Sequence, residues 1–295
     1  MADQQALAYR VVDVFTEQPL EGNALAVFPH ASGLGDVLMQ KIARELNLSE
    51  TVFVFPPSQP AHAASLRIFT PAQEVPFAGH PTVGTGFVLL DEGRVPSTGR
   101  FILEERIGPV PVRVEQGDRP LIWLTTPPIQ FGPTFDPVLC ANVLGLDEDD
   151  LLPAAPQLLS AGNPAIFIGL KNRAAVDRAW LDLSGAKQLR GTLPTALCVF
   201  VFAPESQGAY SRMFAPEYGI PEDPATGSST GPLAAYMMRH KLVSGAPGTR
   251  FVSEQGAKMG RRSILHIQIH GEQGTDGIEV GGYVTPLVNA VMRLS

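Results

Sequence analysis

Short apolar runs, most of them bounded by glycine or proline, make up the hydrophobic pattern of the chain. Runs of this length and period predict β-strands. Turn residues separate each run from the next, so many short strands are expected rather than long helices. The predicted strands cover residues 9–15, 24–28, 51–55, 66–69, 110–115, 121–124, 165–169, 196–202, 210–214, 264–269 and 278–280.

Helical periodicity is found in three places. Val37, Leu38, Ile42 and Leu46 fall on one face of a helix predicted within residues 36–47. Further helices are predicted over residues 81–90 and about 230–240, and a glycine-rich stretch leads into each of them. Strands and helices together predict a mixed α/β (α+β) fold.

The chain also matches itself when it is shifted by 145 residues. Residues 67–86 then align without a gap on residues 212–231, with six identities, where unrelated segments would give roughly one. At the same shift Glu50 falls on Thr195, and at a nearby shift Gly22 and Asn23 pair with Gly162 and Asn163. A period this long does not suit a solenoid and predicts two homologous domains.

We place these domains at residues 1–127 and 128–295, divided in the proline-rich stretch TTPPIQFGPTFDP. Whether the C-terminal segment returns to the first domain stays open. A duplicated fold commonly places equivalent loops face to face, so we expect a ligand cleft where the two glycine-rich turns meet.

Composition narrows the class of function. With 22 Lys and Arg against 29 Asp and Glu, the formal net charge is −7, which argues against a nucleic-acid partner. No apolar run reaches the length of a membrane span, and the N-terminus does not resemble a secretory signal. Two cysteines, Cys140 and Cys198, cannot form a disulfide framework, so we expect a cytoplasmic protein.

The two glycine-rich turns are the first candidate binding elements. Gly79 and Gly227 stand where each turn enters its helix, and the free N–H groups of a helix start suit an anion such as a carboxylate. The alternative is that these glycines only allow close packing. A nucleotide-binding P-loop is disfavoured, because no Lys-Ser/Thr pair follows the first turn.

Two carboxylates stand at non-equivalent places in the repeat. Glu50 opens a strand and aligns with Thr195, whereas Asp223 lies in PEDPATG and aligns with Ala78. This asymmetry suggests a specialised acid and base. The alternatives are a solvated strand-start Glu and a turn-forming Asp. His80 could bind substrate or cap the first-domain helix.

Two competing motifs remain. Residues 227–231 match G-x-S-x-G, the nucleophile elbow of serine hydrolases, with Ser229 as the nucleophile. The elbow needs a strand that ends directly in the turn, whereas EDPAT precedes this one. His266 and His270 share one face of a predicted strand, but no further ligands lie nearby in the sequence, so we expect no metal site.

Five segments of this chain carry a family resemblance: YRVVDVFTEQPLEGNALAVF, LNLSETVFVF, RIFTPAQEVPFAGHPTVGTGFVL, GIPEDPATGSSTGPLAAYM and SEQGAKMGR. Together they resemble the PhzF-like isomerases of phenazine biosynthesis over nearly the whole chain. The resemblance implies the diaminopimelate epimerase fold, in which two similar domains each wrap a mostly antiparallel sheet around a central helix. It also implies a homodimer without metal or organic cofactor.

The resemblance further implies residue roles. Glu50 matches the general acid/base that moves a proton between two carbons of trans-2,3-dihydro-3-hydroxyanthranilate, and Asp223 matches the carboxylate beside the substrate amine. His80 joins them as a catalytic candidate, while Gly79, Gly227 and Ser228 are the expected substrate-binding residues.

Diaminopimelate epimerases carry cysteines in the two turns, whereas this chain has none there, so a two-cysteine mechanism is not available. The physiological substrate stays open. The alternatives to a proton-transfer isomerase are the serine hydrolase and a non-catalytic protein that binds a small carboxylate.

Overall fold

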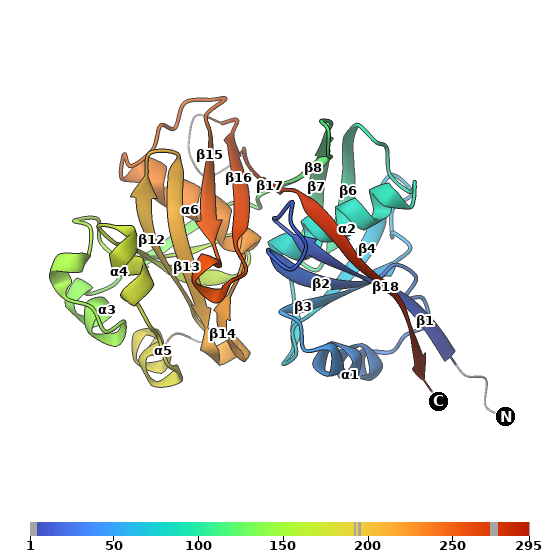
Figure 1. Cartoon of the computed structure of the whole chain (residues 1–295), viewed down its shortest axis with the longest axis horizontal. Helices are drawn as coiled ribbons and strands as arrows, with labels where there is room; N and C mark the ends of the chain where they lie inside the picture. Colours follow the sequence, from blue (N-terminus) through green and yellow to red (C-terminus); the bar gives the residue numbers. More distant parts are fainter. Residues whose placement is uncertain (1–4, 192, 194–195, 272–276, 295) are drawn as a thin grey trace. The chain divides into compact units, whose positions relative to one another are not determined.

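The computed structural model describes residues 5–191, 193, 196–271 and 277–294 of the chain. The chain divides into two compact units, which are described separately (Figure 1). Unit 1 contains residues 1–125 and 281–295, and unit 2 contains residues 126–280. The first unit therefore ends two residues before the boundary expected from the sequence, and the C-terminal segment belongs to it.

Unit 1 is a mostly antiparallel sheet with two helices. Antiparallel pairs join β18 to β1, β1 to β2, β3 to β4, β4 to β5, β6 to β7 and β7 to β8, whereas β2–β3 and β4–β6 are parallel. Its elements are β1 (Gln5–Val14), β2 (Asn23–Phe28), α1 (Asp36–Leu46), β3 (Glu50–Phe55), β4 (Ala64–Phe69), β5 (Glu74–Val75), α2 (Gly79–Asp91), β6 (Gly99–Glu105), β7 (Gly108–Glu115), β8 (Leu121–Thr125) and β18 (Val284–Leu294).

Unit 2 repeats this arrangement. Antiparallel pairs join β9 to β10, β10 to β11, β12 to β13, β13 to β14 and β15 to β16, and β11–β12 and β13–β15 are parallel. Its elements are β9 (Gln130–Thr134), α3 (Pro137–Val143), β10 (Gln157–Ser160), β11 (Pro164–Gly169), α4 (Arg173–Arg178), α5 (Leu183–Arg190), β12 (Cys198–Glu205), β13 (Gly208–Ala215), β14 (Ile220–Asp223), α6 (Gly227–Arg239), β15 (Arg250–Gln255), β16 (Ser263–Ile269) and β17 (Ile278–Gly282), the last of which crosses the boundary between the units, with short 3-10 helices at Glu148–Asp150, Pro216–Tyr218 and Ala257–Met259.

Each unit holds one almost fully buried helix against its sheet. Helix α2 contacts β1, β2, β3, β7 and β8, and α6 contacts β10, β11 and β16. Both helices are 13 residues long and are buried over most of their length. A helix with no solvated face belongs in a core, so α2 and α6 are the central helices that the resemblance implies.

The central helices begin earlier than the sequence indicates. Helix α2 starts at Gly79 rather than at residue 81, and α6 starts at Gly227 rather than near residue 230. A Cβ atom added at Gly84 would lie 2.6 Å from Leu25 Cδ2 and 2.8 Å from Val14 Cγ2. Gly84 therefore permits close packing of α2 against β1 and β2.

The strands β9 and β18 were not predicted from the hydrophobic pattern. Strand β9 contains Gly132 and Pro133, and β18 contains Pro286, and such residues normally mark turns. Strand β18 nevertheless pairs with β1 along its whole length, with a bulge between Val11 and Val12 of β1 (Figure 1). Proline is tolerated at sheet edges and bulges, so tertiary pairing outweighs the local signal here.

Strand registers give the true correspondence of the two units. Val52 faces Ile68 where β3 pairs with β4, and Phe200 faces Met213 where β12 pairs with β13. The shift between units is therefore 148 residues for β3 and β12 (52 to 200), but 145 for β4 and β13 (68 to 213). Between the matched positions the chain is three residues shorter in unit 2, where 200 to 213 replaces 52 to 68. The added 3-10 helix Pro216–Tyr218 restores the shift to 148.

An Arg–Glu pair marks the same place in both units. Arg67 donates from Nε and Nη2 to Glu74 at 2.8 and 2.7 Å. Arg212 donates from the same two atoms to Glu222, both at 2.8 Å. The two arginines are 145 residues apart in the sequence and the two glutamates are 148 apart, in agreement with the strand registers.

This register corrects both partners assigned to the candidate carboxylates. Residue 50 corresponds to Cys198 and not to Thr195, which lies outside the described residues. Asp223 faces Met213 as Val75 faces Ile68, so its counterpart is Val75 and not Ala78. A gapless alignment could not reveal this, because the chain length changes twice, once between β3 and β4 and again, in the opposite direction, between β4 and β5.

Candidate functional site

The candidate residues of unit 1 gather at the start of α2. Glu50 is the first residue of β3 and lies beside Leu25 of the parallel strand β2. Asn23 begins β2, and His80 is the second residue of α2. Parallel pairing brings the starts of β2 and β3 to the same edge of the sheet.

His80 links these side chains. Its Nδ1 lies 3.3 Å from Asn23 Nδ2 and 3.4 Å from Glu50 Oε2. The Glu50 side chain is 14% exposed, whereas that of His80 is 3% exposed. The carboxylate can therefore reach a small ligand, while the imidazole supports it from inside.

Burial keeps His80 neutral. It lowers the pKa of this imidazole to about 3, because the charged form loses its hydration. A neutral ring has one donor and one acceptor nitrogen, so Nδ1 can accept from Asn23 or donate to Glu50. No hydrogen-bond partner for Nε2 is found within the described part of the chain. The N-cap of α2 is Ala78, without a side-chain cap, so His80 does not cap the helix.

Asn23 is a site residue that sequence reasoning did not select. A signal was present, since Gly22 and Asn23 pair with Gly162 and Asn163 in the repeat. Gly22 has φ +67°, and an added Cβ would overlap the Val14 carbonyl oxygen. The glycine therefore permits the tight turn that delivers Asn23 to His80.

The candidate residues of unit 2 form a second hydrogen-bonded cluster. Asp223 ends β14 and is 6% exposed, and its Oδ2 accepts from Thr226 Oγ1 at 2.5 Å. Gln255, fully buried at the end of β15, donates from Nε2 to the Asp223 carbonyl oxygen at 2.7 Å and to Thr226 Oγ1 at 3.0 Å. Gln255 lies in the segment SEQGAKMGR, which carries part of the family resemblance but contains no residue with an expected role.

The glycines expected to bind substrate open the two central helices. Gly79 is the first residue of α2, and Gly227 and Ser228 are the first two of α6. The N–H groups of a first helical turn have no partner within the helix, and the helix dipole favours negative charge there. Each helix start can therefore bind a carboxylate oxygen.

The hydrolase motif does not form a nucleophile elbow. Ser229 is the third residue of α6, and its N–H donates to the Thr226 carbonyl oxygen at 3.1 Å. Three residues separate β14 from this helix, whereas the elbow needs a strand that runs directly into the turn.

The two cysteines are not among the candidate catalytic or binding residues. Cys140 and Cys198 are both buried thiols, and neither forms a disulfide with the described part of the chain. Burial, with a smaller effect of Asp136, raises the pKa of the Cys140 thiol to about 12, so this thiol is not a ready nucleophile.

No group of three or more metal-ligating side chains occurs within the described ranges. His270 instead pairs through Nε2 with Glu279 Oε2 at 2.9 Å. No helix among the described residues is both long and apolar enough to span a membrane.

Comparison with known proteins identifies the family. Residues 12–290 match the family model of phenazine biosynthesis-like proteins, PhzC-PhzF. The chain belongs to this family. It is 36% identical over 283 residues to the trans-2,3-dihydro-3-hydroxyanthranilate isomerase of Pseudomonas aeruginosa, covering 93% of this chain and 95% of the relative. This member of the PhzC-PhzF family is an isomerase.

Solved structures support the fold. A predicted epimerase from Pseudomonas aeruginosa, 33% identical, matches 98% of this chain and all of its own with a TM-score of 0.84. A hydroxyproline epimerase from Agrobacterium vitis, 13% identical, matches all of this chain and 94% of its own with a TM-score of 0.68. The PhzC-PhzF chain therefore has the fold class shared with proline racemases and diaminopimelate epimerases.

Proposed function

We propose that this isomerase moves a proton between two carbons of trans-2,3-dihydro-3-hydroxyanthranilate, or of a cyclic amino carboxylate with the same reacting groups. The observation that carries the proposal is the Glu50–His80 pair, 3.4 Å apart at the start of a buried helix. The 36% identity to an isomerase with this substrate in its name supports the substrate class.

In this proposal Glu50 is the general acid/base. Its carboxylate removes a proton from one substrate carbon and returns a proton to another, so no net charge is gained. In the tautomer that carries its proton on Nδ1, neutral His80 donates to the Glu50 carboxylate, and Asn23 Nδ2 lies 3.3 Å from the same ring nitrogen. All groups needed for the transfer belong to the protein, so we propose a reaction without cofactor.

The remaining candidates hold the substrate. In unit 1 the N–H group of Gly79, and in unit 2 the N–H group of Gly227 and the Ser228 hydroxyl, are donors suited to a carboxylate of the substrate. Asp223 provides negative charge for the substrate amine, and Thr226 and Gln255 fix its orientation.

Replacement of Glu50 tests the proposal. Glu50→Gln keeps the shape and hydrogen bonding of the side chain but cannot accept the proton. We expect turnover of trans-2,3-dihydro-3-hydroxyanthranilate to fall by about 10²- to 10⁴-fold while binding is retained. In heavy water, the wild-type enzyme should place deuterium on the product carbon that receives the proton.

The matched control is Glu45→Gln, the same change at an exposed position of α1, which should leave turnover unchanged. Near-normal turnover by Glu50→Gln would exclude Glu50 as the essential base. Binding of the substrate by the wild type without turnover or deuterium exchange would favour the non-catalytic binding protein.

We also propose that the protein is a homodimer in the cytoplasm. The family resemblance supports the dimer, and the two buried thiols agree with a reducing compartment. Strand β18 offers an interaction surface, since Leu287, Val288 and Val291 are exposed along it.

A further inference from the structure

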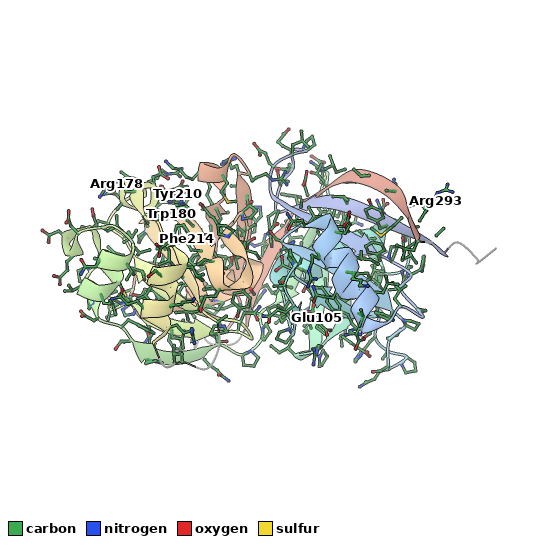
Figure 2. The ribbon with its side chains drawn as sticks, turned by 90° about the horizontal axis from the view of Figure 1, so that it is seen from below. Glu105, Arg178, Trp180, Tyr210, Phe214 and Arg293 are labelled. Atoms are coloured by element: carbon green, nitrogen blue, oxygen red, sulfur yellow. The ribbon has the colours of Figure 1, made fainter. Side chains whose placement is uncertain are left out.

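Glu105 is a buried carboxyl group that the proposed mechanism does not use. It ends β6 inside unit 1 and is 7% exposed (Figure 2). Its Oε1 accepts from Thr82 Oγ1 at 2.6 Å, and the carboxyl group also accepts from the backbone N–H of Ala78. Ala78 is the N-cap of α2, and Thr82 lies one turn into that helix.

Unit 2 contains the same hydrogen-bonding arrangement, with an amide side chain in place of the carboxyl group. Gln255 ends β15 as Glu105 ends β6, and its Oε1 accepts from the backbone N–H of Thr226, the N-cap of α6, at 3.1 Å. The helix threonines also correspond. In each unit the helix threonine, Thr82 or Thr230, places Oγ1 2.9 Å from the carbonyl oxygen of its N-cap residue.

The protonation of Glu105 makes the match closer. Burial raises the pKa of this carboxyl to about 8, although the hydrogen bonds from Thr82 and Ala78 act in the opposite direction. At neutral pH the group is therefore a carboxylic acid, which is uncharged like an amide. Both units thus place a neutral oxygen acceptor on the residue that precedes the central helix.

We propose that Glu105 is a positioning residue of the isomerase, which fixes Ala78 and Thr82 and thereby the first turn of α2. That turn carries Gly79 and His80, the groups that bind substrate and hold Glu50. Gln255 sets the first turn of α6, with Gly227 and Ser228, in the same way. The inference rests on the proposed function for these four residues.

Two substitutions of Glu105 test the proposal. Glu105→Ala removes the acceptor, and we expect kcat/KM to fall by about 10- to 100-fold, because small displacements of catalytic groups are costly. Glu105→Gln restores the acceptor that unit 2 already uses, and its kcat/KM should stay within about threefold of the wild type. A residue needed only for its charge would not be rescued in this way.

The matched control is Glu104→Ala, one residue earlier in β6. Glu104 accepts from the backbone N–H groups of Ser58 and Gln59, from Ser58 Oγ and from His62 Nδ1. Its loss also removes several hydrogen bonds, but these hold the segment 58–62 and not α2. We expect Glu104→Ala to lower stability and to leave kcat/KM within about twofold.

Amide hydrogen exchange provides a readout that does not depend on the substrate. Exchange over residues 78–82 should accelerate at least about tenfold in Glu105→Ala and stay unchanged in Glu105→Gln and Glu104→Ala. If the wild type does not turn over the proposed substrate, the proposed function fails while this exchange pattern still decides the role of Glu105. Should Glu105→Ala not fold, Thr82→Val removes one donor and should give a smaller loss in the same direction.

Two results would overturn the proposal. One is wild-type exchange over residues 78–82 in folded Glu105→Ala. The other is Glu105→Gln being as impaired in kcat/KM as Glu105→Ala.

Discussion

At the scale of residues, burial decides how chemically identical groups behave. Glu104 and Glu105 are neighbours on β6 and project to opposite faces of the strand. For Glu104, burial acts to raise the pKa, but the hydrogen bonds from Ser58, His62 and Gln59 outweigh it and lower the pKa to about 2. For Glu105, burial dominates and the pKa rises to about 8.

Glu105 is therefore predicted to make stability depend on pH. Its pKa is raised from 4.5 to about 8 on folding, so the folded state binds the extra proton between these values and stability falls as pH rises through that window. Glu105→Gln removes this cost. Relative to the wild type, the variant should gain roughly 3 kcal/mol between pH 4 and pH 7, measured by urea unfolding.

The control for this prediction is Glu104→Gln, where the sign is reversed. The pKa of Glu104 is lowered on folding, so its contribution is present above about pH 4.5 and lost as pH falls through 2. This variant should lose stability at neutral pH and approach the wild type in acid. Parallel pH profiles for Glu105→Gln and the wild type would contradict the assignment of a buried acid.

Asp223 allows a second prediction at this scale. Asp223→Asn keeps an oxygen that can accept from Thr226 but removes the negative charge proposed for the substrate amine. We expect KM to rise about tenfold, since charged hydrogen bonds contribute about 1.5–3 kcal/mol, together with a lower kcat. Steady-state kinetics on the isomerase substrate measure both.

Glu222→Gln is the neighbouring control, because Glu222 pairs with Arg212 and not with Thr226. It should reduce stability without raising KM. An unchanged KM in Asp223→Asn would place the substrate amine elsewhere.

At the scale of elements, each central helix combines close packing with a first turn that we propose to bind substrate. Their first residues offer free N–H groups, while the glycines that follow lie against strands or neighbouring side chains. The segment must satisfy both demands, so its composition is unusual for a helix. This explains why the glycine-rich stretches indicate turns although they are helical.

Gly231 of α6 provides the test. A Cβ added there would overlap Oγ1 and Cγ2 of Thr126. Gly→Ala within a helix normally stabilises by about 1 kcal/mol, but here we expect a loss of about 1–3 kcal/mol from overpacking. The double variant Gly231→Ala/Thr126→Ala should recover part of that loss in thermal unfolding. Stabilisation by Gly231→Ala alone would show that Thr126 moves aside freely.

At the scale of the whole molecule, the C-terminal strand completes unit 1 and presents apolar side chains to solvent. Val291 is 56% exposed on β18, and Arg293 lies near the end of this strand (Figure 2). Natural sheet edges usually carry charge or are covered. The exposed apolar residues therefore favour a covered edge in the assembled protein.

We expect sedimentation of a dimer at micromolar concentration and a shift toward monomer in Val291→Lys. Val37→Lys, at a 72% exposed position of α1, should leave the dimer intact. A monomeric wild-type profile would contradict the proposed homodimer.

Features encoded in short continuous segments could be predicted from the amino-acid sequence. Alternation of apolar residues marked most strands of both units, because each such strand buries one face. The motifs around Glu50, His80 and Asp223 determined the family and the candidate chemistry, because these residues lie within continuous segments. The repeat indicated two units of one fold, although the gapless match gave Glu50 and Asp223 the wrong counterparts.

Only the folded chain reveals which residues lie next to those of the candidate site. Asn23 meets His80 across 57 residues, Gln255 meets Thr226 across 29, and Glu105 meets Thr82 across 23. None of these contacts could be predicted from the periodicity of apolar residues, because the pairing of strands, and not their spacing along the chain, brings the partners together. The return of β18 to β1 has the same cause: a strand is recruited by the unpaired backbone groups of its neighbour, and those are defined only once the sheet has formed.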